Sequence, residues 1–272
     1  MNRTNPIGFF DSGIGGLTVV KSVSSLLPNE NIVYFGDTAR VPYGSKSNET
    51  VIEYSLQAAN FLLRKNIKLL VVACNTASSV ALKELKRFLT IPVIGMIEPG
   101  AKMALQESKN GIVGVIGTRA TINNKAYALE LKKLNPKTKV FEQPCPLFVP
   151  LAEEGWLDHK ATELIAKEYL SPLREKKIDS LILGCTHYPI LADIIQKVVG
   201  KNVTLIDSGT PAARIVEEYL NARGLRNTSN QIGQKEFYVS DVPAKFREIA
   251  EKFLGKKITH LHKVELEELT NE

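Results

Sequence analysis

The sequence has few cysteines and no closely spaced pair of them. Cys74, Cys145 and Cys185 lie far apart in 272 residues, and no CxxC pair occurs. An odd number of widely spaced cysteines argues against a disulfide framework, a zinc site or a thiol redox protein. We therefore expect no bound metal and a reducing compartment, which indicates a cytoplasmic protein.

Long apolar runs and basic patches are also missing. No apolar run approaches the roughly 20 residues that span a bilayer, and no charged start precedes an apolar stretch at the N-terminus. The net charge of +6 comes from lysines in mixed-charge segments such as 130–139, without a basic patch interleaved with aromatic residues. We expect neither a membrane nor a nucleic acid as partner, although the charge favours encounters with an acidic small molecule.

The motifs of nucleotide-binding proteins are absent as well. The glycine-rich stretch DSGIGG, residues 11–16, follows a predicted strand at 7–10 but lacks the GxGxxG spacing and the GK[ST] ending of phosphate-binding loops. We therefore expect no nucleotide cofactor. Asp11 stands at the strand end, where it is either a helix cap or a carboxylate facing a ligand.

The most informative stretch that is present runs from Leu69 to Ser79, LLVVACNTASS. Its apolar first half predicts a strand buried on both faces of a parallel sheet, and the Ser and Thr residues that follow are typical of a helix start. Cys74 is thereby placed at the carboxyl end of a strand. Ligands of open α/β sheets bind at that edge, beside helix N-termini that favour a carboxylate or a thiolate.

The same construction occurs again between Leu181 and Ile190, where LIL is followed by GCTHYPI. Cys185 takes the place of Cys74, and similar segments stand at similar distances before and after each cysteine. We interpret the chain as two half-repeats, each with one cysteine at an equivalent strand end.

The repeat and the alternation of strands and helices predict an α/β fold of two similar domains. Each has a mainly parallel sheet flanked by helices, and the pair is pseudo-symmetric with an active site in the cleft between. Hydrophobic residues at 44% and charged residues at 24% suit an ordinary globular protein. We expect residues 1–97 and 208–272 to form a discontinuous first domain and residues 98–207 the second.

Two further segments carry candidate site residues. The loop 36–47 is long, polar and placed after a predicted strand at 31–35, so Tyr43 and Gly44 are candidates for hydroxyl or backbone contact with a ligand. The apolar, turn-rich segment 146–156 ends in Glu153 and Glu154, which the pattern does not rank. Cys145 has no polar neighbours and is interpreted as a packed hydrophobe.

Two thiols facing one cleft suggest a specific chemistry. One group can remove a proton from a carbon while the other returns a proton to the opposite face, which inverts a stereocentre. A thiol is mostly protonated at neutral pH, so each needs a neighbouring base or a helix N-terminus. Asp11 and His187 are the candidates for orienting and deprotonating the thiols.

Five segments taken in order resemble the glutamate racemase family, a cofactor-independent family that interconverts L- and D-glutamate for peptidoglycan synthesis. They are DSGIGGLTV, GDTARVPYGSKS, VVACNTASSVAL, CPLFVPLAEEG and LGCTHYPIL. The resemblance implies that Cys74 removes the α-proton of D-glutamate and Cys185 that of L-glutamate. It further implies Asp11 and His187 as auxiliary acid–base groups, Glu153 as a helper, and no cofactor.

The resemblance also implies a set of substrate contacts in this sequence. They are Asp11, Ser12, Tyr43, Gly44, Asn75, Thr76, Thr118, Thr121, Thr186 and His187. The segment INNKAY, residues 122–127, matches the family pattern only loosely, so no contact is carried over from that segment.

Alternative interpretations are a related racemase acting on aspartate or a hydantoin, and a non-catalytic interaction protein. Some members of the family are described as inhibiting DNA gyrase, but the intact surroundings of Cys74 and Cys185 favour retained catalysis, and the sequence does not support a gyrase interaction. We expect glutamate as the small-molecule substrate and a second copy of the chain as the partner, in a homodimer.

Overall fold

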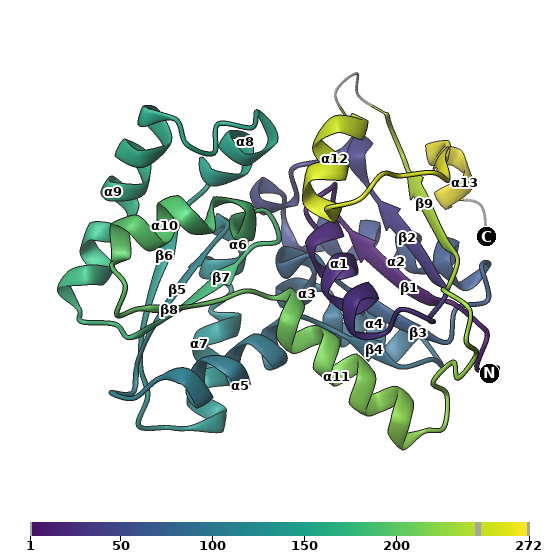
Figure 1. The fold of residues 1–272 in the computed structure, drawn as a ribbon, viewed down its shortest axis with the longest axis horizontal. Helices are drawn as coiled ribbons and strands as arrows, with labels where there is room; N and C mark the ends of the chain where they lie inside the picture. Colours follow the sequence, from purple (N-terminus) through teal and green to yellow (C-terminus); the bar gives the residue numbers. More distant parts are fainter. Residues whose placement is uncertain (1, 243–245, 271–272) are drawn as a thin grey trace.

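Two parallel sheets form the framework of the structure, a computed structural model that describes residues 2–242 and 246–270. The strands are β1 (Ile7–Asp11), β2 (Ile32–Gly36), β3 (Leu69–Val72), β4 (Val93–Ile94), β5 (Ile112–Gly117), β6 (Lys139–Pro144), β7 (Ser180–Gly184), β8 (Thr204–Ile206), β9 (Lys235–Val239) and β10 (Leu261–Lys263). One sheet has the order β10-β9-β2-β1-β3-β4 and the other β6-β5-β7-β8. Figure 1 shows the two sheets in separate bodies that lie side by side.

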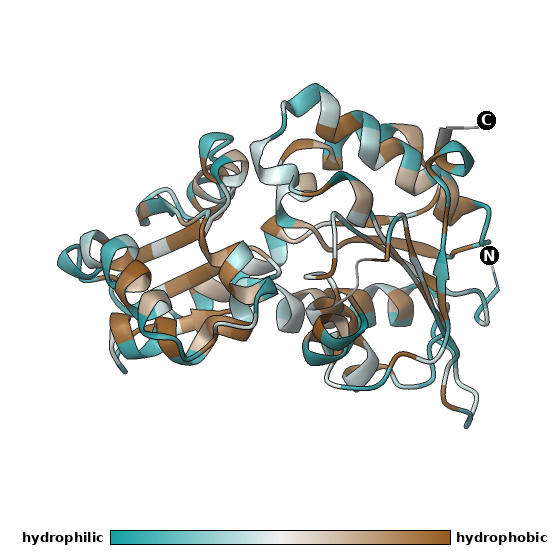
Figure 2. Ribbon diagram, turned by 90° about the horizontal axis from the view of Figure 1, so that it is seen from above, coloured by the Kyte–Doolittle hydropathy of each residue, from teal (hydrophilic) through white to brown (hydrophobic). Residues whose placement is uncertain are grey.

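Helices cover both faces of each sheet, as parallel strands require. The α-helices are α1 (Leu17–Leu26), α2 (Asn48–Leu63), α3 (Asn75–Val80), α4 (Leu82–Phe88), α5 (Ile97–Glu107), α6 (Arg119–Asn123), α7 (Ala126–Leu134), α8 (Phe148–Glu153), α9 (Lys160–Glu175), α10 (Ala192–Val199), α11 (Gly209–Ala222), α12 (Phe246–Leu254) and α13 (Leu266–Thr270). Short 3-10 turns η1 (Thr38–Arg40), η2 (Tyr43–Ser45) and η3 (Tyr188–Leu191) complete the described elements. In Figure 2 the strands are mostly brown and the outer helices and loops mostly teal, which reflects apolar residues inside and polar residues outside.

The two sheets repeat one arrangement of strands. In the first, β1 pairs with β2 and β3, and β3 pairs with β4. In the second, β5 pairs with β6 and β7, and β7 pairs with β8. The predicted fold of two similar, mainly parallel α/β units is therefore confirmed. Cys74 follows β3 and Cys185 follows β7, so both cysteines stand at equivalent strand ends.

The C-terminal part of the chain extends the first sheet. β9 pairs in parallel with β2, and β10 pairs with β9. The division of the chain at residues 97/98 and 207/208 remains a prediction. Among the described residues, no helix is both long enough and apolar enough to cross a bilayer.

Several predicted element boundaries are wrong. The crossover helix expected over 78–88 begins at Asn75 and is interrupted at Ala81. Ser78 does not cap it, because its hydroxyl donates to Val72 O (2.8 Å) and accepts from the amide of Met96 (3.1 Å). The strands expected over 93–96 and 258–262 are shorter or displaced, as β4 and β10 show. The helix expected from Pro243 starts outside the described residues; α12 is described from Phe246.

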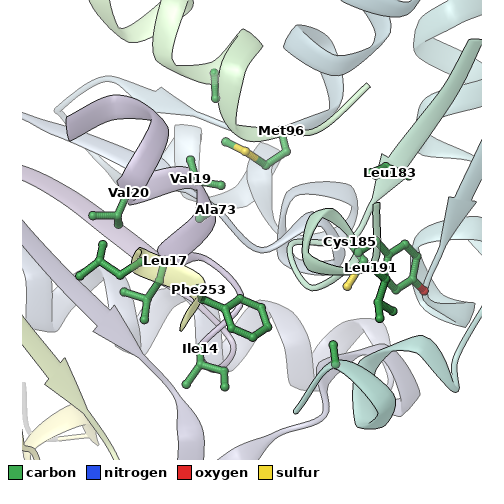
Figure 3. Close-up of a cluster of buried hydrophobic side chains, with 14 of the residues drawn as sticks. Ile14, Leu17, Val19, Val20, Ala73, Met96, Leu183, Cys185, Leu191 and Phe253 are labelled. Carbon is green, nitrogen blue, oxygen red and sulfur yellow. The ribbon is translucent and has the colours of Figure 1, made fainter. Parts of the chain in front are cut away.

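The apolar core runs from one body into the other. One cluster contains Phe9 of β1 and Leu183 of β7, and it includes Ile14 and Phe253 from the first body. Figure 3 shows Ile14, Leu17 and Phe253 on one side and Cys185, Leu183 and Leu191 on the other. The two bodies are therefore packed against each other close to the second cysteine.

Candidate active site

Both repeat cysteines line one cavity between the two bodies. The cavity has a volume of about 550 Å³, which is in the usual range for small-molecule sites. Its wall is formed by residues at the carboxyl ends of β1, β3, β5 and β7 and by the loops after β2 and β6. The side chains of the expected site that line it are Ser12, Tyr43, Gly44, Cys74, Asn75, Thr76, Thr118, Glu153, Cys185, Thr186 and His187.

The first thiol, Cys74, caps helix α3. Its Sγ accepts a hydrogen bond from the Ala77 amide (3.4 Å) and donates one to Ser12 Oγ (3.4 Å). Burial, and next the negative charge of Asp11, raise the pKa of Cys74 to about 12. The expectation that a helix N-terminus would favour the thiolate here is therefore not met, because α3 has only six residues and desolvation outweighs its one amide contact. Cys74 is held as a thiol.

Asp11 lies beneath the cavity wall and joins the two bodies. It is fully buried, and burial raises its pKa even though the positive charge of His187 opposes this. Its Oδ2 accepts from the Gly13 amide (2.9 Å), and its Oδ1 accepts from Thr186 Oγ1 (3.4 Å) in the second body. Neither role left open by the sequence is seen, because α1 has Gly16 at its N-cap without a side-chain cap bond and Asp11 does not line the cavity. Asp11 is instead a buried carboxylate that links the turn after β1 to the segment after Cys185.

The second thiol, Cys185, is part of a chain of three side chains. Its Sγ lies 3.8 Å from Nδ1 of His187, and Nε2 of His187 lies 2.9 Å from Oε1 of Glu153. Burial lowers the pKa of His187, but the hydrogen bonds to Cys185 and Glu153 outweigh this and raise it above its ordinary value. An imidazolium in this place stabilises negative charge on the adjacent sulfur. His187 also packs edge-on against Phe253 of α12, with 5.4 Å between ring centroids.

The glycine-rich stretch 11–16 serves this second site. A Cβ at Gly15 would lie 2.4 Å from Thr186 Oγ1 and 2.5 Å from His187 Nδ1, so only glycine permits this approach. Thr18 Oγ1 donates to Thr186 O at 3.2 Å, which adds a second link. The stretch that resembles a phosphate loop therefore seats the residues after Cys185.

Three threonines form a hydroxyl cluster across the two bodies. Thr76 Oγ1 lies 2.9 Å from Thr118 Oγ1 and 3.4 Å from Thr121 Oγ1, and Thr118 and Thr121 are 3.0 Å apart. Thr118 also caps α6 by accepting from the Thr121 amide (3.2 Å). Thr76 and Thr118 line the cavity, where their hydroxyls can donate to a carboxylate. Thr121 is fully buried behind them.

The loop after β2 presents Tyr43 with its hydroxyl already engaged. Tyr43 Oη donates to Asp37 Oδ2 (2.5 Å), and Asp37 Oδ1 accepts from Ser240 Oγ (2.8 Å) beyond the end of β9. Of the two kinds of contact considered for this loop, the backbone contact stays open, whereas the Tyr43 hydroxyl already donates its proton to Asp37. The buried Asp37 fixes this loop.

Four further residues named from the sequence lie at or near the cavity. Asp11 and Thr121 contact the cavity wall from behind but do not line it. Both glutamates line a smaller neighbouring cavity of about 70 Å³, but Glu153 also lines the main cavity and bonds to His187, whereas Glu154 does not line the main cavity. Cys145 is fully buried, with Sγ 3.6 Å from Gln143 O, outside the cavity lining.

Part of the cavity was not anticipated from the sequence. Its apolar wall is formed by Pro146, Leu147, Val149 and Pro150, the segment that leads into α8. Arg119, at the first position of α6, adds an exposed cation at the rim. The alternation of proline and apolar residues in 146–150 indicated a packed turn and nothing more specific. No group of three potential metal-ligating side chains occurs in the part of the chain that the structure describes.

Comparison with known proteins agrees with this geometry. Residues 16–216 match the model of the Asp/Glu/Hydantoin racemase family. The chain is 53% identical to the glutamate racemase of Geobacter metallireducens over 96% of this chain and 97% of that protein. The structure of glutamate racemase from Francisella tularensis in complex with D-glutamate superposes with a TM-score of 0.91 at 45% identity, covering 97% of this chain and 98% of that one.

A glutamate racemase isoform from Bacillus anthracis superposes with a TM-score of 0.94 at 39% identity, and covers 97% of this chain and 99% of its own. Similarity of this extent reaches both repeat cysteines and nearly the whole length of each relative. The chain therefore belongs to the Asp/Glu/Hydantoin racemase family, and within it to the glutamate racemases.

Proposed function

We propose that the protein interconverts L- and D-glutamate by a two-base mechanism without a cofactor, and so supplies D-glutamate for peptidoglycan synthesis. The observation that carries the mechanism is that two cysteines from equivalent strand ends, Cys74 and Cys185, line one cavity. The family comparison supports the substrate, and the hydroxyl cluster with the Arg119 rim suits a molecule with two carboxylates.

The proton balance follows from the unequal surroundings of the two thiols. With L-glutamate, the Cys185 thiolate removes the α-proton, and the electron pair is held as the carbanion conjugated with the α-carboxylate. The Cys74 thiol then delivers its proton to the opposite face, which gives D-glutamate and leaves a Cys74 thiolate and a Cys185 thiol. The reverse reaction uses the same groups in exchanged roles.

His187 and Asp11 assist from opposite sides. His187, backed by Glu153, stabilises the charge of the Cys185 thiolate. Burial, and next the negative charge of Asp11, raise the pKa of Cys74 and so keep it a proton donor in the resting enzyme. The resting protein is thus prepared to take a proton at Cys185 and give one at Cys74.

Racemisation in deuterium oxide tests the mechanism. Purified protein is given L-glutamate or L-aspartate without added cofactor, and early products are separated by chirality and weighed by mass spectrometry. Two bases predict D-glutamate carrying deuterium at Cα while recovered L-glutamate stays largely protiated. Protiated product in large yield would mean that one base serves both faces.

Independence from cofactors is tested separately. Activity should survive dialysis against a chelator and treatment with borohydride, and the protein should lack a pyridoxal absorbance band. Loss of activity under either treatment would contradict the mechanism. The homodimer and the cytoplasmic location remain predictions from the sequence, and light scattering of the purified protein tests the first.

A further inference from the structure

Tyr127 of α7 touches Asn75, the residue directly after the first thiol, although it comes from the second body. Its ring is fully buried and does not line the cavity. Its hydroxyl donates to Asn75 Oδ1 at 2.6 Å. The segment that contains Tyr127 carried no candidate residue in the sequence.

The fold makes room for this ring with two glycines. A Cβ at Gly100 of α5 would lie 3.2 Å from Tyr127 Cε1, and a Cβ at Gly184 would lie 3.1 Å from Tyr127 Cε2. Gly184 is the last residue of β7 and directly precedes Cys185. One ring therefore contacts the residue before the second thiol and the residue after the first.

A directed chain of hydrogen bonds fixes the Asn75 amide. Asn75 Nδ2 donates to Ser208 Oγ at 3.1 Å, and the Ser208 hydroxyl has Leu183 O and Asn75 Oδ1 as acceptors, each at 3.3 Å. Whether the Ser208 hydroxyl donates to Leu183 O or to Asn75 Oδ1, Oδ1 of Asn75 accepts and Nδ2 donates. Turning the amide over would replace the acceptor Oδ1 of the buried Tyr127 O–H by an N–H group and leave Ser208 as the other side-chain partner of that hydroxyl, which costs free energy.

The fixed amide has one N–H bond left for the cavity. An amide nitrogen carries two N–H bonds, and among the described residues Ser208 is the one hydrogen-bond acceptor of Nδ2. Asn75 is 2% exposed and lines the cavity. We infer that Tyr127 and Ser208 are positioning residues that hold the Asn75 amide so that its second N–H donates to a substrate carboxylate.

The inference rests on the proposed function and makes a specific kinetic prediction. Tyr127→Phe removes the donor that holds Oδ1, so the amide turns in part of the molecules and presents an oxygen to the carboxylate. KM for glutamate should rise about tenfold, which corresponds to about 1.4 kcal/mol, with kcat changed by less than about twofold. Tyr188→Phe is the matched control, because its fully buried hydroxyl donates to a backbone carbonyl, Cys145 O, at 2.8 Å. Its KM should be unchanged.

A double-mutant cycle with Asn75→Ala separates positioning from a general structural effect. If Tyr127 acts through Asn75, adding Tyr127→Phe to Asn75→Ala raises KM no further. Multiplied effects of the two substitutions, or an unchanged KM in a folded Tyr127→Phe variant, overturn the inference. If Tyr127→Phe does not fold, Ser208→Ala probes the same amide and must raise KM. An inactive wild-type protein would instead defeat the proposed function, which keeps the two failures distinct.

Discussion

The two halves of the molecule share a strand order and differ at both positions that follow each cysteine. Cys74 is followed by Asn75 and Thr76, and Cys185 by Thr186 and His187. Thr76 joins a hydroxyl cluster at the cavity wall, whereas His187, at the equivalent place, contacts the neighbouring sulfur and Glu153. A repeated framework thus supplies two equivalent sulfur positions, and the second residue after each sulfur helps to decide how it handles a proton.

The backbone after each cysteine reinforces the difference. Asn75–Val80 forms a helix capped by Cys74, but Tyr188–Leu191 forms a 3-10 turn with Pro189 near its start. Because the second segment does not start an α-helix at once, Cys185 is free of a capping role and its sulfur is available to His187. Similar strands lead to a sulfur that caps a helix in one half and to a sulfur beside an imidazole in the other.

Removal of either thiol is the strongest test of this comparison. Cys74→Ser and Cys185→Ser should each lower racemisation in both directions by about a hundred- to ten-thousandfold, because each direction needs one base and one acid. Chiral assays measure the loss, and circular dichroism checks the fold. Cys145→Ser is the control and should leave the rate unchanged. Near wild-type racemisation by either single variant would refute the assignment.

Alkylation should distinguish the two sulfurs chemically. Their exposures are similar, 4% for Cys74 and 6% for Cys185, so access does not separate them. At neutral pH iodoacetamide should modify Cys185 at least about tenfold faster, because the thiolate is the reactive form and burial, together with the charge of Asp11, keeps Cys74 a thiol. With the pKa of Cys74 raised to about 12, its modification should accelerate about tenfold per pH unit between about 7 and 10.

Peptide mass spectrometry reports both rates, and glutamate should protect both sites. Faster modification of Cys74 at neutral pH would reverse the assigned protonation states.

Substitution of Glu153, the carboxylate that bonds to His187, should have a smaller effect on activity than loss of a thiol. Glu153→Gln should lower kcat about tenfold, less than the loss of a full acid–base group. Because Glu153 helps to raise the pKa of His187, its removal lowers that pKa. The alkaline limb of the activity profile should therefore move to lower pH. Glu154→Gln is the matched control, and an equal shift in this variant would argue against the chain from Cys185 to Glu153.

Arg119, the exposed cation at the rim of the cavity, should contribute least to substrate binding. Arg119 is exposed, so Arg119→Ala should raise KM for glutamate by only about two- to threefold, and added salt should remove the difference. Arg119→Lys should keep the wild-type KM. A loss in kcat instead of KM would place Arg119 in the chemistry.

The sequence predicted the elements that local patterns determine. The apolar strands before Cys74 and Cys185, the repeat and the pairing of each thiol with polar neighbours follow from hydrophobic runs and helix-start residues. Ser78 gave a wrong helix boundary because its hydroxyl accepts from the amide of Met96, at the start of α5, and does not cap the helix. Such contacts depend on tertiary structure.

The same reason explains what the sequence missed at the site. Tyr127 reaches Asn75 because its side chain extends from α7 in one body to the other, and the choice of Glu153 over Glu154 depends on where the end of α8 presents each side chain. The raised pKa of Cys74 depends on burial, which residue spacing does not report.

Because both sulfurs are buried and take opposite roles, the free enzyme exists in two protonation forms, and the form present depends on which enantiomer was released last. On the proposed mechanism, a molecule that has just released D-glutamate holds its proton on Cys185 and none on Cys74, which is the form that accepts D-glutamate. Before it can convert another L-glutamate, a proton must pass between the two sulfurs by way of solvent, although both are at least nine-tenths buried. Since enantiomers have equal free energies, kcat/KM must be the same in both directions at every pH. The cost of this resetting therefore falls on the maximal rate, which at high substrate includes the return of the empty enzyme as one of its steps.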